Sequence, residues 1–170
     1  MGNKRINYLI FTAVCLFLLA GCNREAANDE PVSLPDVACQ PADVTADPPF
    51  TVGSTRTAVP PETFLADQIE NYYGVQLVEN SLTNTTVYCD LFEMADEETA
   101  VEMLARTCSV PDMSQTETPV VGQEVCALES TGYRMVNFRQ ERIVVSILAD
   151  SNGLGVDEWA VAVNGRLQEK

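Results

Sequence analysis

The sequence contains no histidine among its 170 residues. This absence excludes the Ser–His and Cys–His pairs that activate many protein nucleophiles, and it excludes metal sites built on imidazole. The sequence also lacks a G-x-S-x-G turn, a Walker A loop and a G-x-G-x-x-G loop. We therefore expect neither an enzyme nor a bound cofactor. A pair of carboxylates, as in glycosidases, is the catalytic arrangement that the many acidic residues leave open.

Basic residues are scarce. The chain has 10 Lys and Arg against 25 Asp and Glu, which gives a formal net charge of −15. Such a chain repels phosphate groups, so we expect no nucleic acid partner and no docking on anionic lipid headgroups. We interpret the acidic residues as a surface that keeps the protein soluble. The alternative interpretation is an acidic face that binds cations or a basic partner.

Long hydrophobic runs are also rare, and the main one lies near the start. It extends over residues 8–20, after Lys4 and Arg5. As a helix it would span about 20 Å, short of the roughly 30 Å hydrocarbon core of a membrane. This pattern is typical of the apolar region of a signal peptide rather than of a membrane-spanning helix.

The run ends in the sequence Leu-Ala-Gly-Cys at residues 19–22. Together with the basic start, it resembles the lipobox of bacterial lipoproteins, over residues 1–22. The resemblance implies cleavage after Gly21, a diacylglyceryl thioether on Cys22 and an acyl chain such as palmitate on the new amino terminus. It implies a lipid-anchored protein on the extracytoplasmic side of a cell membrane, with inner or outer membrane left open.

Two alternatives concern this amino-terminal segment. The first is an ordinary secretory signal, which would leave Cys22 as a plain thiol. The second is N-myristoylation of Gly2, whose motif requires Ser or Thr at the position that Ile6 occupies. The lipobox reading predicts a signal peptide over residues 1–21.

The next segment, 22–59, is rich in proline and acidic residues and has few large hydrophobic residues. Such a composition buries too little surface to offset the entropy of ordering. It predicts a disordered tether ahead of a globular domain over residues 60–170. A disulfide at Cys39 would fasten the second half of that tether to the domain.

Four cysteines remain after Cys15 and Cys22 are set aside. They are Cys39, Cys89, Cys108 and Cys126. An even number beyond an export signal predicts two disulfides. Sequence allows three pairings, and we favour Cys108–Cys126 with Cys39–Cys89. A thiolate metal site and a redox pair are the rival readings, although no C-x-x-C motif occurs and no metal site is predicted.

Hydrophobic periodicity predicts three helices and five strands in residues 60–170. The helices cover 60–74, 95–108 and 156–170, and the strands cover 75–82, 84–94, 123–129, 134–138 and 142–149. Asp96 is the expected N-cap of the second helix, whose buried stripe would be Val101, Leu104, Ala105 and Cys108. The last strand is the most apolar, so we place it at the centre of the sheet.

This order, α-β-β-α-β-β-β-α, predicts an α+β fold with one mostly antiparallel sheet of four to five strands and helices largely on one face. Residues 90–105, DLFEMADEETAVEMLA, resemble the strand-then-helix unit of bacterial extracytoplasmic α+β domains of unknown function. That similarity covers residues 60–150 and implies an architecture without an activity.

No local motif identifies a ligand. Residues 150–158, DSNGLGVDE, depart from the EF-hand pattern and indicate a turn before a helix. Tyr72, Tyr73 and Trp159 could line a ligand groove, although packing in the core is favoured. The leading hypothesis is a binding or accessory module that acts through protein–protein contact. The alternatives are a small-molecule or cation-binding lipoprotein and, less favoured, a hydrolase with a carboxylate pair.

Overall fold

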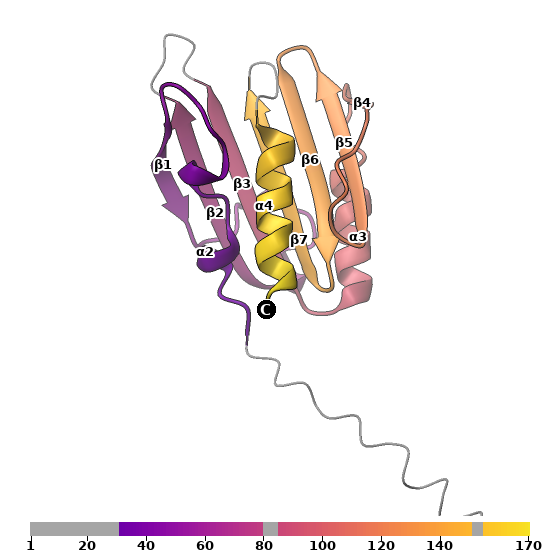
Figure 1. The fold of residues 1–170 in the computed structure, drawn as a ribbon. Coiled ribbons are helices and arrows are strands. Elements are labelled where there is room, and N and C mark those ends of the chain that lie inside the picture. The colour runs from indigo at the N-terminus through magenta and orange to yellow at the C-terminus, as the bar shows by residue number, and fades with distance from the viewer. Residues whose placement is uncertain (1–30, 80–84, 151–154) are drawn as a thin grey trace, which may run out of the picture. The chain divides into compact units, whose positions relative to one another are not determined.

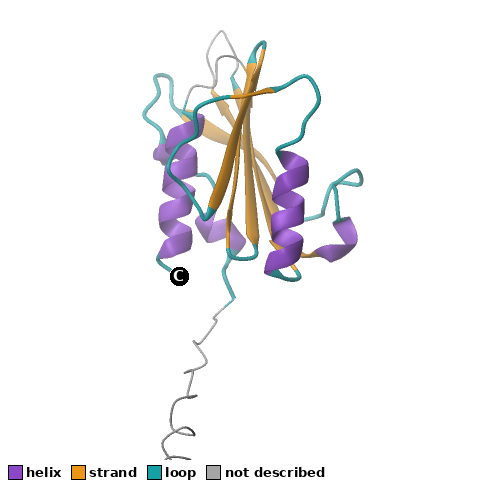
Figure 2. Ribbon diagram, turned by 90° about the vertical axis from the view of Figure 1, so that its right-hand side faces the viewer, coloured by secondary structure: helices purple, strands orange, loops and turns teal. Residues whose placement is uncertain are grey.

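Seven antiparallel strands form one open sheet, and helices pack on both of its faces (Figures 1 and 2). The structure is a computed structural model that describes residues 31–79, 85–150 and 155–170. The strand order across the sheet is β1-β2-β3-β7-β6-β5-β4. β1 and β4 are therefore the two edges, and β7 is the central strand.

The elements have the following bounds. The strands are β1 (Phe50–Arg56), β2 (Ile69–Glu79), β3 (Thr86–Met94), β4 (Ser114–Gln115), β5 (Glu124–Ser130), β6 (Tyr133–Gln140) and β7 (Ile143–Asp150). The helices are α2 (Leu34–Val37), α3 (Glu97–Thr107) and α4 (Val156–Gln168), with short 3-10 turns η1 (Pro41–Asp43) and η2 (Ala66–Gln68).

The α+β class with a single antiparallel sheet is confirmed, but the predicted strand number and element order are wrong. The sheet has seven strands rather than four to five. The additional strands are β1, which lies in the predicted tether, and the two-residue β4, which lies in a predicted loop. The expected placement of helices on one face is also wrong, because α3 and α4 lie on opposite faces (Figure 2).

The predicted helix over residues 60–74 is absent. Leu65 has a left-handed backbone with φ of 52°, and the 11-residue strand β2 begins at Ile69. β2 pairs with β3 along most of its length, Tyr72 opposite Phe92 and Val75 opposite Cys89. Tertiary strand pairing overrides the weak helical periodicity of this segment, whose β-branched and aromatic residues suit a strand.

Much of the segment predicted as a tether is part of the folded domain. Residues from Val32 onward belong to the same unit as the rest of the domain, and residues 50–56 form β1. Leu34 and Val37 are fully buried, and Cys39 is almost so. Contacts with residues far along the chain order this segment, and its local composition does not reveal them. The predicted signal peptide, Cys22 and residues 22–30 lie outside the described residues.

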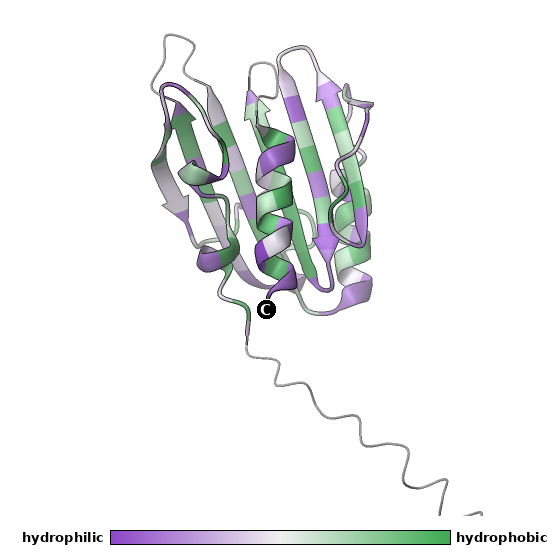
Figure 3. Cartoon of the chain, in the orientation of Figure 1, coloured by the Kyte–Doolittle hydropathy of each residue, from purple (hydrophilic) through white to green (hydrophobic). Residues whose placement is uncertain are grey.

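One core fills the space between the sheet and α4. Trp159 is fully buried and meets the ring of Phe50 edge to face, with 4.8 Å between the ring centroids. Val145, Ile147 and Ala149 of β7 are fully buried in this core, so the prediction that this strand lies at the sheet centre is confirmed. Figure 3 shows stretches of hydrophobic residues on the long strands, with hydrophilic residues between them.

A second, smaller core lies under α3. Ala100, Met103 and Leu104 of this helix pack on the sheet, whereas Val101 is 40% exposed. The buried side of α3 is thus rotated about the helix axis by about one residue position from the predicted side. The predicted N-cap is confirmed, because the Asp96 carboxylate accepts a hydrogen bond from the Thr99 amide at 2.7 Å. Within the described ranges no helix is long and apolar enough to cross a membrane.

Candidate binding site on the open sheet face

α3 covers only one end of its sheet face. Beyond it, a row of side chains crosses four strands in direct register: Gln76, Tyr88, Leu148 and Met135. These four are half-buried, and Tyr133 in the next row is 50% exposed. We call this region, with Asp90 at its border, the open sheet face. It combines aromatic, aliphatic and polar side chains on a rigid sheet.

Asp90 lies one row nearer to α3, with its carboxylate held by residues of two other strands. The Tyr72 hydroxyl donates a hydrogen bond to Asp90 Oδ1 at 2.5 Å, and Arg56 Nη2 donates to the same oxygen at 2.9 Å. No other hydrogen bond reaches this carboxylate from the described residues. The second oxygen, Oδ2, is therefore held in position with no donor among the described residues, on a side chain that is 22% exposed.

Gly74 makes room for this arrangement. It lies opposite Asp90 in the β2–β3 register, between Tyr72 and the Asp90 side chain. A Cβ atom at residue 74 would meet the Tyr72 hydroxyl and would lie 2.5 Å from Asp90 Oδ1. Since real Cβ atoms do not approach other heavy atoms so closely, the hydrogen bond between Tyr72 and Asp90 requires glycine here.

The surroundings of Asp90 and Tyr72 raise the pKa of both side chains. Burial raises the pKa of the Asp90 carboxyl above its ordinary value, and the Tyr72 hydrogen bond and the charge of Arg56 offset this rise in part. Burial, followed by the neighbouring Asp90 carboxylate, raises the pKa of Tyr72. Tyr72 therefore remains a hydrogen-bond donor at neutral pH, and Asp90 accepts a proton or a hydrogen bond more readily than an exposed aspartate does.

The row that contains Asp90 continues as a line of polar side chains. Ser146 lies opposite Asp90, and Asn137 lies opposite Ser146. Asn137 is fully buried and donates a hydrogen bond to the Thr107 carbonyl at 3.1 Å, but its own Oδ1 atom has no partner in the described part of the chain. A buried carbonyl oxygen without a partner is uncommon, and this one lies out of reach of solvent because Asn137 is fully buried.

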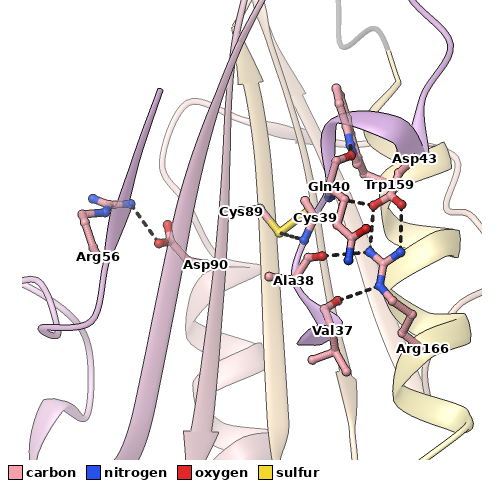
Figure 4. Close-up of a disulfide and its surroundings, with 10 residues drawn as sticks. All are labelled: Val37, Ala38, Cys39, Gln40, Asp43, Arg56, Cys89, Asp90, Trp159 and Arg166. Atoms are coloured by element: carbon pink, nitrogen blue, oxygen red, sulfur yellow. Dashed lines mark hydrogen bonds and ion pairs between the residues drawn. A yellow bond between two sulfur atoms is a disulfide. The ribbon is translucent and has the colours of Figure 1, made fainter. Parts of the chain in front are cut away.

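The opposite face carries a disulfide directly behind Asp90 (Figure 4). The structure pairs Cys39 with Cys89 and Cys108 with Cys126, with Cα–Cα distances of 6.1 and 6.0 Å. This is the pairing that the sequence analysis favours. The first bridge ties the segment before β1 to β3, and the second ties the end of α3 to β5.

Residues 32–49, which we call the N-terminal strap, are also fastened to α4. Arg166 donates hydrogen bonds to the Val37 and Ala38 carbonyls and forms two to the Asp43 carboxylate, at 2.7 to 3.2 Å (Figure 4). The Trp159 indole donates to the Gln40 carbonyl at 3.1 Å. These contacts make the strap a structural part of the domain.

A second surface feature is a hollow of about 410 Å³ beside Arg134. Arg134 forms ion pairs with Glu129 and Asp157 there. The guanidinium thus has its partners within the protein, and the hollow offers no unpaired cation to a ligand. No cluster of three or more His, Cys, Asp or Glu residues suited to a metal ion occurs among the described residues.

Alternation along β3 places Asp90 on the same face as Tyr88 and Phe92. The sequence analysis did not predict the contacts of Asp90 with Tyr72 and Arg56. The available signal was an acidic residue in the middle of an otherwise apolar strand. Comparison with models of known protein families and with curated proteins gives no match.

Proposed function

We propose that the chain is a lipid-anchored bacterial lipoprotein. In this proposal residues 1–21 are removed, Cys22 carries the lipid, and the domain that begins at Val32 functions outside the cytoplasm. The Leu-Ala-Gly-Cys motif supports the anchor. The two disulfides support an oxidising compartment, since such bonds persist mainly outside the cytoplasm.

We propose further that the domain is a binding module that acts through protein–protein contact on the open sheet face. The observation that carries this proposal is the row of Tyr88, Leu148 and Met135 beside the fixed carboxylate of Asp90. Tyr and Met are enriched at protein interfaces, and a positioned polar group adds specificity. Val32 packs against the core beneath α4, on the face opposite to the open sheet face.

Detergent partitioning tests the anchor. The mature protein should enter the detergent phase, and the Cys22→Ser variant, exported without lipid, should stay in the aqueous phase. A wild-type protein that remains aqueous, or that retains its first 21 residues by mass spectrometry, contradicts the proposed anchor.

Site-specific photocrosslinking in the native cell tests the binding face. A crosslinking residue at position 133, which is 50% exposed on the open sheet face, should capture a defined protein partner. The matched control is position 161 on α4, which is 54% exposed on the opposite face. Equal capture at both positions, or none at position 133, contradicts a protein-binding role for this face.

Small-molecule binding is the second candidate function. It is favoured by Asp90 Oδ2, an acceptor atom to which no described residue donates, at the border of the open sheet face. A ligand with hydrogen-bond donors would raise the melting temperature of the wild type in a metabolite screen. The Asp90→Asn variant should lose that shift, and a shift that persists in the variant places the ligand elsewhere.

A further inference from the structure

The two edges of the sheet differ in how well they are protected against pairing. β4 is a two-residue edge strand, and such short edges offer little to an added strand. β1 has seven residues, and all of them after Phe50 are exposed. In the described part of the chain β1 pairs only with β2, so it is an edge strand.

The charge distribution also favours β1 as the edge at which two copies pair. Residues 48–61 form the longest stretch without an acidic residue between residue 25 and the end of the chain. Its single charged residue is Arg56, which Asp90 neutralises at 2.9 Å. In a chain with a net charge of −15, this edge is where two copies can approach without opposing their carboxylates.

We infer that β1 is a self-association surface, at which the β1 strands of two copies pair antiparallel and join two sheets into one. A β-bulge between Val52 and Ser54 divides the strand into two regular runs, Phe50–Val52 and Ser54–Arg56. The first run begins at the buried Phe50, whereas the second is exposed throughout, so we place the pairing at Ser54–Arg56. The twofold axis therefore passes beside Thr55, which meets Thr55 of the second copy. Cross-strand pairs of threonine are favourable in antiparallel sheets.

Symmetry makes this pairing compatible with a shared membrane. Antiparallel pairing about a twofold axis perpendicular to the sheet keeps equivalent faces of both copies on the same side. Both N-terminal straps then lie on one side, and both open sheet faces form a continuous surface on the other. The compatibility with a shared membrane rests on the proposed lipid anchor, whereas the pairing of the β1 strands does not.

Sedimentation equilibrium of the exported Cys22→Ser chain tests the inference without membrane or partner. At about 100 µM the wild-type sequence should have the mass of two chains and should dissociate on dilution, as expected for a micromolar interface. Thr55→Lys and Thr55→Asp should each weaken association about tenfold or more, because they place like charges face to face. An equimolar mixture of the two variants should restore the dimer.

Val161→Lys is the control, since it adds the same charge at an exposed position on α4. It should leave the dimer unchanged. A wild-type monomer at this concentration overturns the inference, and so does a dimer that survives both Thr55 substitutions. Hydrogen exchange of the wild type provides an independent measurement, because β1 amides should gain protection as the concentration rises. Unchanged β1 exchange across the dimer transition would also overturn it.

Discussion

Cys89 and Asp90 are consecutive residues of β3 whose side chains leave the sheet on opposite faces (Figure 4). Cys89 is bonded to Cys39 of the N-terminal strap, and Asp90 accepts hydrogen bonds from Tyr72 and Arg56 on the open sheet face. Because side chains alternate along a β-strand, the Cys39–Cys89 disulfide lies directly behind the Asp90 carboxylate.

Tyr72→Phe should change the pH dependence of stability. The folded pKa of Tyr72 is raised above the unfolded value of about 10, so its contribution is complete below pH 10 and is lost as the pH rises further. Urea unfolding should show the wild type more stable than the variant at pH 8, with the difference narrowing above pH 10. Tyr133→Phe is the control for loss of one phenol. A difference that stays constant from pH 8 to pH 11 contradicts the prediction.

Gly74→Ala should destabilise the domain by about 1–3 kcal/mol, because the added methyl group collides with the Tyr72 hydroxyl and Asp90 Oδ1. Tyr72→Phe should reduce this cost in a double-mutant cycle, since it removes one of the colliding atoms. Gly165→Ala is the matched control. Open space surrounds that helical position, so alanine should stabilise by about 0.5–1 kcal/mol. Equal effects at the two glycines would argue against a special role for Gly74.

Removal of the disulfides should have unequal effects. Cys39–Cys89 closes a sequence separation of 50 residues, and Cys108–Cys126 closes 18. The loop-entropy relation gives about 4 kcal/mol for the former and about 3 kcal/mol for the latter. Denaturation midpoints of the Cys39→Ala/Cys89→Ala and Cys108→Ala/Cys126→Ala variants measure the two costs. A larger loss for the second pair would show that loop length does not set the order.

Arg166→Lys should release the N-terminal strap. A lysine cannot reproduce the fork of hydrogen bonds to the Val37 and Ala38 carbonyls and to Asp43, so we expect a loss of about 2 kcal/mol. Faster hydrogen exchange over residues 34–43 would accompany it. Arg106→Lys provides the control, because Arg106 forms an exposed ion pair with Glu102 that contributes less than about 0.5 kcal/mol. Similar losses for both substitutions would contradict this role for Arg166.

The sequence predicted the elements whose periodicity is strong and local. β3, α3, the hairpin of β6 and β7, and α4 all lie close to their expected positions. The favoured packing of Trp159 in the core is also confirmed, because this residue is fully buried. In these segments propensity, hydrophobic pattern and tertiary contacts favour the same structure.

The failures lie where distant residues decide the structure. The N-terminal strap resembles a disordered segment in composition, yet it is ordered by Cys89, Trp159 and Arg166, which lie 50 to 129 residues away from their strap partners. The contacts of the candidate site could not be predicted for the same reason. Arg56, Tyr72 and Asp90 lie on three strands, and only the strand register brings them together.

The bond between Cys39 and Cys89 also sets how the domain would withstand mechanical force. Cys39 follows Cys22 by 17 residues, a stretch of at most about 60 Å when fully extended. With a lipid on Cys22, tension between the membrane and a bound partner would peel away no more of the chain than this. The load would then pass through sulfur into β3, which lies between β2 and β7, so the hydrogen-bonded ladders on both sides of it would share the strain.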